Sequence, residues 1–369
     1  MGKVPEEPAA RSGQDSARAS DSDYEVIGGN GVIDDRLAYR DEVADEEPHA
    51  PPPRPLEVTL DAAWTAWREA LTTFGSLWFW LACALGVLLS WGLATGLVAF
   101  GEANGWFSTP VAGADYLLMG AWLAIAAAVL GAVWGFRRAP SSFLVSLFAG
   151  LLRGAAFAVP SGVVLAVVGA SSGGPIGMAG AAVVIALIEV ALFGLIGAGL
   201  RACFSHGVPG AILLGLVLVF LGFGNIVATI MLLPSTMSVE QASVPVNVER
   251  DDSGRITAYE CVGQLHQVEV AHTDRVAWIA ASNPAMVFGS VAAETMSQDN
   301  ELAWVLFGLQ WAADGPQRDV PCLGGESSDG LPPSMPVALT GLALQSAVAA
   351  LVYVPGRIAR SRRPLGDPT

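Results

Sequence analysis

Two ionisable residues lie inside long apolar segments of the sequence. Arg153 falls about ten residues into segment 143–169, and Glu189 falls near the middle of segment 176–200. An ionisable side chain in hydrocarbon is costly, so both are candidate functional residues. With a rise of ~1.5 Å per residue, both would lie near the middle of a membrane, on consecutive antiparallel helices that usually pack together. The pattern therefore predicts an intramembrane ion pair between Arg153 and Glu189.

This predicted pair has two possible roles. It could be a buried structural pair that fixes the register of the two helices, or it could take a direct part in transport or gating. Arg153 could also extend its long side chain inward, toward the cytoplasmic interface, without pairing.

Three other residues in the apolar segments could shape or bridge the helices. Pro160 removes one backbone hydrogen bond and predicts a kink, which either serves as a hinge or simply sets the helix shape. Asn225 and Gln345 are neutral polar residues that could hydrogen-bond between helices or line a pathway.

The sequence contains none of the common catalytic or metal-binding motifs. Lys3 is the only lysine, so no Gly-x-x-x-x-Gly-Lys-Ser/Thr phosphate loop can form and this chain does not hydrolyse ATP by that route. No Gly-x-Ser-x-Gly nucleophile elbow is present. His266, Glu269 and His272 lack the spacing of a metal site and are interpreted as surface residues. We expect no enzymatic activity, no cofactor and no metal in this chain.

The composition indicates a membrane protein. Of 369 residues, 53% are hydrophobic and 14% are charged, which is too apolar for a soluble protein of this length. The net charge of −15 comes almost entirely from the tail before Pro55 and from residues 234–334, outside the apolar segments. Membrane lipid is an expected partner, and nucleic acid is not, because an acidic surface repels phosphates. Nearly all basic residues are Arg, which favours a GC-rich bacterial genome.

Six apolar segments are each close to or above the ~20 residues that cross ~30 Å of hydrocarbon. They span residues 74–100, 116–136, 143–169, 176–200, 211–233 and 337–354. The predicted fold is thus an all-α polytopic membrane protein. Its expected parts are a disordered acidic cytoplasmic tail (1–55), an interfacial helix (56–72), spans one to five (73–233), an extracytoplasmic domain (234–335), a sixth span (336–355) and a basic cytoplasmic tail (356–369).

Residues 56–72 have the pattern of an amphipathic helix. Four large apolar residues recur at spacings of four, three and four and so share one helical face: Leu60, Trp64, Trp67 and Leu71. Charged residues lie off that face, which predicts a helix lying on the inner leaflet. The two tryptophans suit the headgroup boundary.

The arginines predict the orientation of the chain. They fall before the first apolar segment, between the second and third, at the end of the fourth and after the sixth: Arg54, Arg68, Arg137, Arg138, Arg201, Arg357, Arg360, Arg362 and Arg363. Loops 101–115 and 170–175 contain no Lys or Arg. The positive-inside rule therefore predicts a multi-pass protein of the bacterial plasma membrane with both termini in the cytoplasm and residues 234–335 outside.

The outward region is predicted to be a small α+β domain. Residues 244–248 and 256–259 flank a polar turn that contains Gly, which is typical of a β-hairpin, and residues 268–270 have the pattern of another strand. Ser282 or Asn283 can cap a helix that has Pro284 in its first turn.

The four cysteines fall in two kinds of place. Cys83 and Cys203 lie in or at the end of apolar segments, where a thiol behaves as a small apolar group. Cys261 and Cys322 lie in the outward region, where a disulfide can persist. We predict a bridge between these two, the alternative being two unpaired thiols.

The order of these parts resembles the membrane subunit of type-2 ABC exporters, the ABC-2-like permeases. In that family a surface helix connects to a separate ATPase, the loop between helices two and three couples to it, and short re-entrant helices precede helix six. The resemblance implies that residues 56–71 are the connecting helix and that residues 136–142, with Arg137 and Arg138, form the coupling loop. It also implies that the apolar run 302–311, too short to span a bilayer, is interfacial or re-entrant.

A short segment strengthens the resemblance. Residues 272–284 are similar to an outer-loop segment of actinobacterial permeases of this kind, in which Thr-x-Arg is followed by Trp and then Asn-Pro. The departure is at Gly289 and Ser290, which stand where that family has an Asp.

Two functions from different classes are consistent with the sequence. The first is a permease subunit, working as a homodimer or heterodimer, that moves a substrate across the membrane under power from ATP bound to a separate ABC ATPase subunit. The alternative is a membrane sensor or envelope assembly factor whose outward domain binds a ligand or a protein.

Overall fold

The computed structural model describes residues 55–105, 113–138, 142–250, 256–295, 303–318, 320–327 and 335–362. In this part the chain is mostly helical, with one two-stranded sheet. The acidic tail expected over residues 1–55 lies outside the described residues except for Pro55, as does the part of the basic tail after Arg362. The described residues from Pro55 onward belong to one compact unit.

Six helical segments are long and apolar enough to cross a membrane, as predicted. They are α2 (Leu77–Ala103), α3 (Ala114–Arg137), α4 (Phe143–Ser172), α5 (Ile176–Cys203), the broken segment Gly207–Thr236 and α11 (Val337–Ser361). The broken segment contains α6 (Gly207–Val219), a π turn η1 (Phe220–Gly224), α7 (Asn225–Leu232) and a 3₁₀ turn η2 (Leu233–Thr236). Helix α11 continues beyond the predicted end of the sixth span, so the first residues of the expected basic tail are helical.

Helix α5 forms the centre of the bundle, packed against α3, α4 and α11. Small residues let the backbones approach: a Cβ on Gly135 of α3 would lie 2.0 Å from the carbonyl oxygen of Gly194, and one on Gly197 would lie 2.1 Å from that of Ala132. Such close contact is typical of helices that pack in lipid. Helix α2, in contrast, exposes a row of large apolar side chains, among them Trp78, Leu85 and Leu88.

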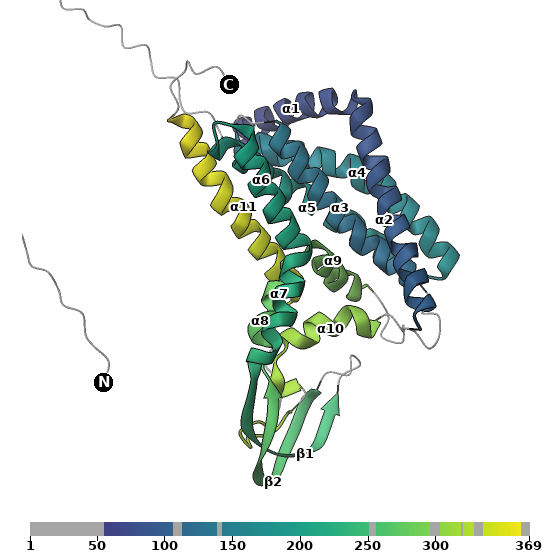
Figure 1. The fold of residues 1–369 in the computed structure, drawn as a ribbon, viewed down its shortest axis with the longest axis vertical. Coiled ribbons are helices and arrows are strands. Elements are labelled where there is room, and N and C mark those ends of the chain that lie inside the picture. Colours follow the sequence, from purple (N-terminus) through teal and green to yellow (C-terminus); the bar gives the residue numbers. More distant parts are fainter. Residues whose placement is uncertain are drawn as a thin grey trace, which may run out of the picture. The chain divides into compact units, whose positions relative to one another are not determined.

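Helix α1 (Pro55–Phe74) lies across the end of the bundle where α3 ends and α4 begins (Figure 1). Its small residues face the bundle, and Ala62 and Ala66 pack on Val145 and Ala149 of α4. The four large residues that define its predicted apolar face are exposed. This arrangement suits an interfacial helix, because the alanine face allows close packing and the Trp and Leu face remains available to lipid.

The sheet is a long antiparallel hairpin of β1 (Met237–Arg250) and β2 (Ile256–Ala271), which pair from Met237 with Ala271 onward. The prediction of a separate strand at residues 268–270 is wrong, since these residues belong to β2 and pair with the start of β1. The register shifts near Gly263, whose φ of +87° suits a bulge. The bulge accommodates the register shift, so β2 continues to pair with β1 on both sides of it.

Two short helices after the hairpin, α8 (Asp274–Ala281) and α9 (Pro284–Ala293), form a pair bent by 105°. Helix α9 packs against α3, α5 and α11, with Phe288 buried against Gly120. The run predicted to be interfacial or re-entrant forms α10 (Ala303–Ala313), which packs on α8 and α9. Gln310 Oε1 accepts a hydrogen bond of 2.9 Å from the Val337 backbone nitrogen. The bent pair before the sixth span is thus α8–α9. A 3₁₀ turn η3 (Pro316–Arg318) follows α10.

Candidate functional site

A buried polar cluster surrounds the break between α8 and α9. Asn283 caps α9, because its Oδ1 accepts a hydrogen bond of 2.8 Å from the Ala285 nitrogen and Pro284 follows in the first turn. This confirms the predicted cap. Asn283 is fully buried and Ser282 is 7% exposed, so their polar groups depend on partners from other helices.

The fifth segment supplies partners through its π turn. Asn283 Nδ2 donates to the carbonyl oxygen of Gly222, inside the turn, at 2.7 Å. It also donates to Asn225 Oδ1 at 3.2 Å. Asn225 Nδ2 in turn donates to Ser282 Oγ at 3.1 Å. A π turn changes the hydrogen-bonding register of a helix and is often found at functional sites, and here it holds the break between α8 and α9 to the fifth segment.

The opposite side of the break is held by Gln345 of α11 and Glu189 of α5. Gln345 Nε2 donates to the Ser282 carbonyl oxygen at 3.1 Å and to Glu189 Oε1 at 3.0 Å. A carbonyl can only accept, so the contact with Ser282 fixes which way the amide points. Both side chains are fully buried, and Glu189 Oε2 and Gln345 Oε1 have no hydrogen-bond partner among the described residues.

The predicted ion pair between Arg153 and Glu189 is not formed in the described structure. Their helices are neighbours, with Gly150 and Gly154 of α4 on the face that packs against α5. Arg153 lies off this face, and its side chain lines a cavity beside Arg138 instead. The alternative of a long side chain that extends toward the polar end of its helix therefore describes Arg153 better.

The other predicted residues lie in separate places. Pro160 is on an exposed face of α4, which continues from Phe143 to Ser172 without a break. Arg137 ends α3 with its side chain exposed. Arg138 Nη1 donates to the Glu69 carbonyl oxygen at 3.0 Å and to Thr72 Oγ1 at 2.9 Å, which ties α1 to the end of α3. Residues 139–141 of the expected coupling loop lie outside the described part of the chain.

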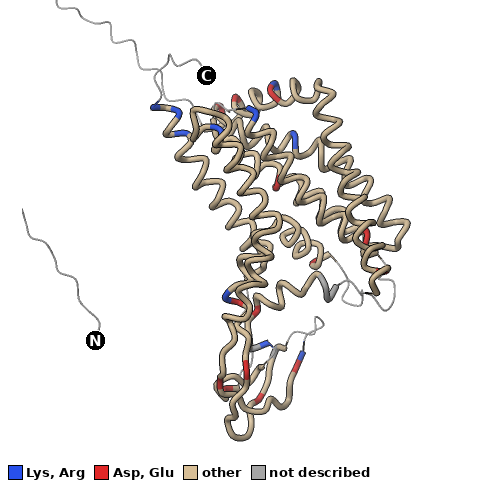
Figure 2. Tube along the Cα trace, in the orientation of Figure 1, with Lys and Arg blue, Asp and Glu red and all other residues tan. Residues whose placement is uncertain are grey.

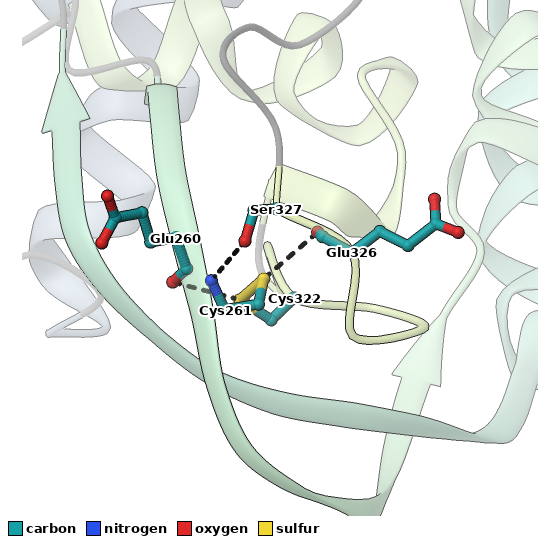
Figure 3. The surroundings of a disulfide bond; sticks show 5 residues. All are labelled: Glu260, Cys261, Cys322, Glu326 and Ser327. Carbon is teal, nitrogen blue, oxygen red and sulfur yellow. Dashed lines mark hydrogen bonds between the residues drawn. A yellow bond between two sulfur atoms is a disulfide. The ribbon is translucent and has the colours of Figure 1, made fainter.

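Cys261 and Cys322 form a disulfide, as predicted (Figure 3). The bond joins β2 to the segment after α10, and the Cys261 nitrogen donates to Ser327 Oγ at 2.8 Å. On the other strand, the Ser243 nitrogen donates to the Cys322 carbonyl oxygen at 3.1 Å. The late segment is thereby fixed to both strands of the hairpin.

Replacing both cysteines of this disulfide by alanine is expected to destabilise the hairpin region. The bridge closes a loop of 61 residues, and removing such a bridge typically costs about 2–4 kcal/mol. Limited proteolysis of the folded protein will measure the effect as faster cleavage within residues 237–327. A reductant should accelerate cleavage of the parent protein and leave the double variant unchanged. Equal cleavage rates of both proteins without reductant would contradict the expectation.

The base of the hairpin has its own polar contact. His272 Nε2 and Glu240 Oε1 are 2.5 Å apart, and the His272 nitrogen donates to the Thr236 carbonyl oxygen at 3.0 Å. The hydrogen bond from His272 holds the pKa of the Glu240 carboxyl below its usual value. His272 is therefore buried at this base, contrary to its interpretation as a surface residue.

No group of three or more metal-binding side chains is found among the described residues. Comparisons of the chain with protein-family models, with curated proteins and with solved structures gave no match. Glu189, Asn225 and Gln345 were each predicted from the sequence as candidate polar residues. Ser282 and Asn283 were predicted only as a possible helix cap, and the Asn-Pro pair was the signal that marked the break.

Proposed function

We propose that this chain is the membrane-spanning permease subunit of a transporter of the type-2 ABC exporter kind, driven by a separate ATPase subunit. The observation that carries the proposal is the pairing of two features at opposite ends of one bundle. Helix α1 lies across one end, joined to the end of α3 through Arg138. The bent pair α8–α9, which precedes α10 and α11 in the chain, enters from the other end. Both features are expected of that family.

Charge supports an orientation for this proposal. Among the described residues, most arginines lie at the end of the bundle that carries α1 (Figure 2). The disulfide joins β2 of the hairpin to the segment after α10, at the other end. Arginine favours the cytoplasmic side and a disulfide favours an oxidising one. The α1 end then faces the cytoplasm of a bacterial cell, with both termini inside, and the hairpin region lies outside the plasma membrane.

The polar cluster suggests how the two ends are coupled. An ATPase that moves α1 and the connection between α3 and α4 would move the bundle around α5, since α1 packs on α4 and α4 packs on α5. Glu189 on α5 reaches the break between α8 and α9 through Gln345. A shift of α5 would therefore change the hydrogen bonds that hold the bent pair. Two copies, or one copy and a related chain, would enclose the substrate path.

Affinity purification in mild detergent, with mass spectrometry and an ATPase assay of the eluate, tests the proposal. We expect a stoichiometric ABC ATPase subunit in the eluate of the unmodified protein. Arg137→Glu, beside the proposed coupling loop, should lower its recovery on the order of tenfold, because a reversed charge at an interface weakens complementarity.

Arg275→Glu, an exposed charge reversal in α8 at the opposite end, is the matched control and should leave recovery unchanged. Purification of the chain alone, or only with envelope proteins, would contradict the transporter proposal and favour the sensor or assembly-factor alternative.

A further inference from the structure

A groove of about 660 Å³ opens on the side of the bundle between α2 and α3. Its inner part is apolar and is lined by Leu81, Ala82 and Leu85 of α2 and Leu130 of α3. Its other part lies near the end of α1 and is lined by Thr73 and Ser76, together with three arginines, Arg137, Arg138 and Arg153. The groove is thus apolar toward the middle of the spans and strongly basic toward their α1 end.

Arg153 is the central feature of the basic part. Its side chain is 6% exposed, and its Nε and Nη2 atoms have no hydrogen-bond partner among the described residues. Burying unpaired guanidinium donors is unfavourable unless a partner is supplied. Arg137 and Arg138 line the same groove, and the one acidic residue beside Arg153, Glu69, lines only the adjoining smaller cavity. The groove is therefore lined by three positive charges and, among the described residues, by no acidic side chain.

The depth of Arg153 fits the boundary of a membrane. Helix α4 has 30 residues, or ~45 Å, and so exceeds the ~30 Å of hydrocarbon, which places Arg153 on the α1 side of the membrane centre. Its side chain extends further toward the α1 end. Its donors then lie just below the headgroup level, with the end of α3 above them. The exposed apolar residue Leu85 lies eight residues, or ~12 Å, into α2 and so farther from the α1 end than these donors.

We propose that this groove binds an anionic phospholipid of the leaflet that α1 faces. The headgroup phosphate accepts hydrogen bonds from Arg153 and is neutralised by Arg137 and Arg138, and an acyl chain lies along Leu85 and Leu130. Basic pockets between membrane helices are a known way to bind anionic headgroups. The inference rests on the six helices crossing a membrane and does not depend on an ATPase partner.

Native mass spectrometry of the purified protein, titrated with lipids of identical acyl chains, tests this binding site. We expect phosphatidylglycerol to bind at least about tenfold more tightly than phosphatidylcholine, since charge-assisted hydrogen bonds to phosphate are among the stronger polar contacts. Arg153→Gln should remove this preference. Arg201→Gln, an arginine at the same end of the bundle that does not line the groove, should retain it.

A second pair of variants tests the apolar part without changing any charge. Ala82→Trp fills the groove and should weaken phosphatidylglycerol binding, whereas Ala84→Trp, on an exposed face of the same helix, should not. Glycerol phosphate without acyl chains should bind much more weakly than the lipid. Equal binding of the two lipids, an unchanged preference in Arg153→Gln, unchanged phosphatidylglycerol binding in Ala82→Trp, or equally tight binding of free glycerol phosphate would each overturn the proposal.

Discussion

Replacing Gln345 by leucine is expected to lower the free energy of unfolding by about 3 kcal/mol, because it leaves a buried carboxyl oxygen and a buried backbone carbonyl without a donor. Gln345 Nε2 is the hydrogen-bond donor to both Glu189 Oε1 and the Ser282 carbonyl oxygen. Leucine is close to glutamine in size, so packing should change little. Reversible unfolding in mixed detergent and SDS micelles will measure the difference from the parent protein.

The double variant Glu189→Leu and Gln345→Leu is the control for this reasoning. Removing both partners of a buried polar contact costs less than removing one, so the double variant should be more stable than Gln345→Leu alone by at least about 1 kcal/mol. A remaining loss is expected from the unpaired Ser282 carbonyl. Two results would show that the contact between Glu189 and Gln345 does not stabilise the fold. One is a Gln345→Leu variant as stable as the parent protein, and the other is a double variant no more stable than Gln345→Leu.

Replacing Gly341 by alanine is expected to destabilise the protein by about 2–4 kcal/mol. An added Cβ would lie 2.1 Å from the Ala281 carbonyl oxygen and 2.7 Å from Val287 Cγ2, so the bent pair would have to move away from α11. Overpacking of this kind costs about 1–3 kcal/mol. Gln345 lies one turn further along the same face of α11, so the displacement would also lengthen its hydrogen bond to Ser282, which is worth about 1 kcal/mol.

Gly96→Ala in α2 is the matched control, because a Cβ there meets no atom within 4 Å. The change should leave stability within about 1 kcal/mol of the parent protein. If the transporter proposal holds, Gly341→Ala should also reduce transport more than Gly96→Ala does at a temperature where both remain folded. Equal unfolding free energies for the two variants would show that α8–α9 does not pack tightly on α11.

The helices that are long and apolar enough to span a membrane could be predicted closely from the sequence because their signal is local. A long uninterrupted apolar stretch is enough to indicate a helix such as α4 or α5, and the ends agree within a few residues. The amphipathic pattern of α1 and the Asn283 cap with its following Pro284 depend on residues within one or two helical turns. The pairing of Cys261 with Cys322 followed from their location in the same polar region between two apolar segments.

The partners of the polar side chains were decided only by the tertiary structure. Glu189 and Gln345 are 156 residues apart, and Asn225 lies 57 residues from Ser282, so neither contact follows from helical periodicity. Because α4 and α5 are consecutive, the sequence suggested Arg153 as the partner of Glu189. Contact between two helices does not, however, determine which face of its helix a given side chain occupies. Arg153 lies beside, not on, the face that contacts α5.

The bent pair α8–α9 could likewise be predicted only in part from the sequence. Its sequence predicts a helix start at Pro284, yet each piece is too short to indicate by itself that it enters the bundle. Its position depends on Gly120 and Gly341, which leave room for Phe288 and Val287, and on the π turn that presents the Gly222 carbonyl to Asn283. Length and hydrophobicity along the chain thus determined which segments can span a membrane. Close packing between distant helices determined what their polar residues contact, because complementary surfaces exist only once the helices are assembled.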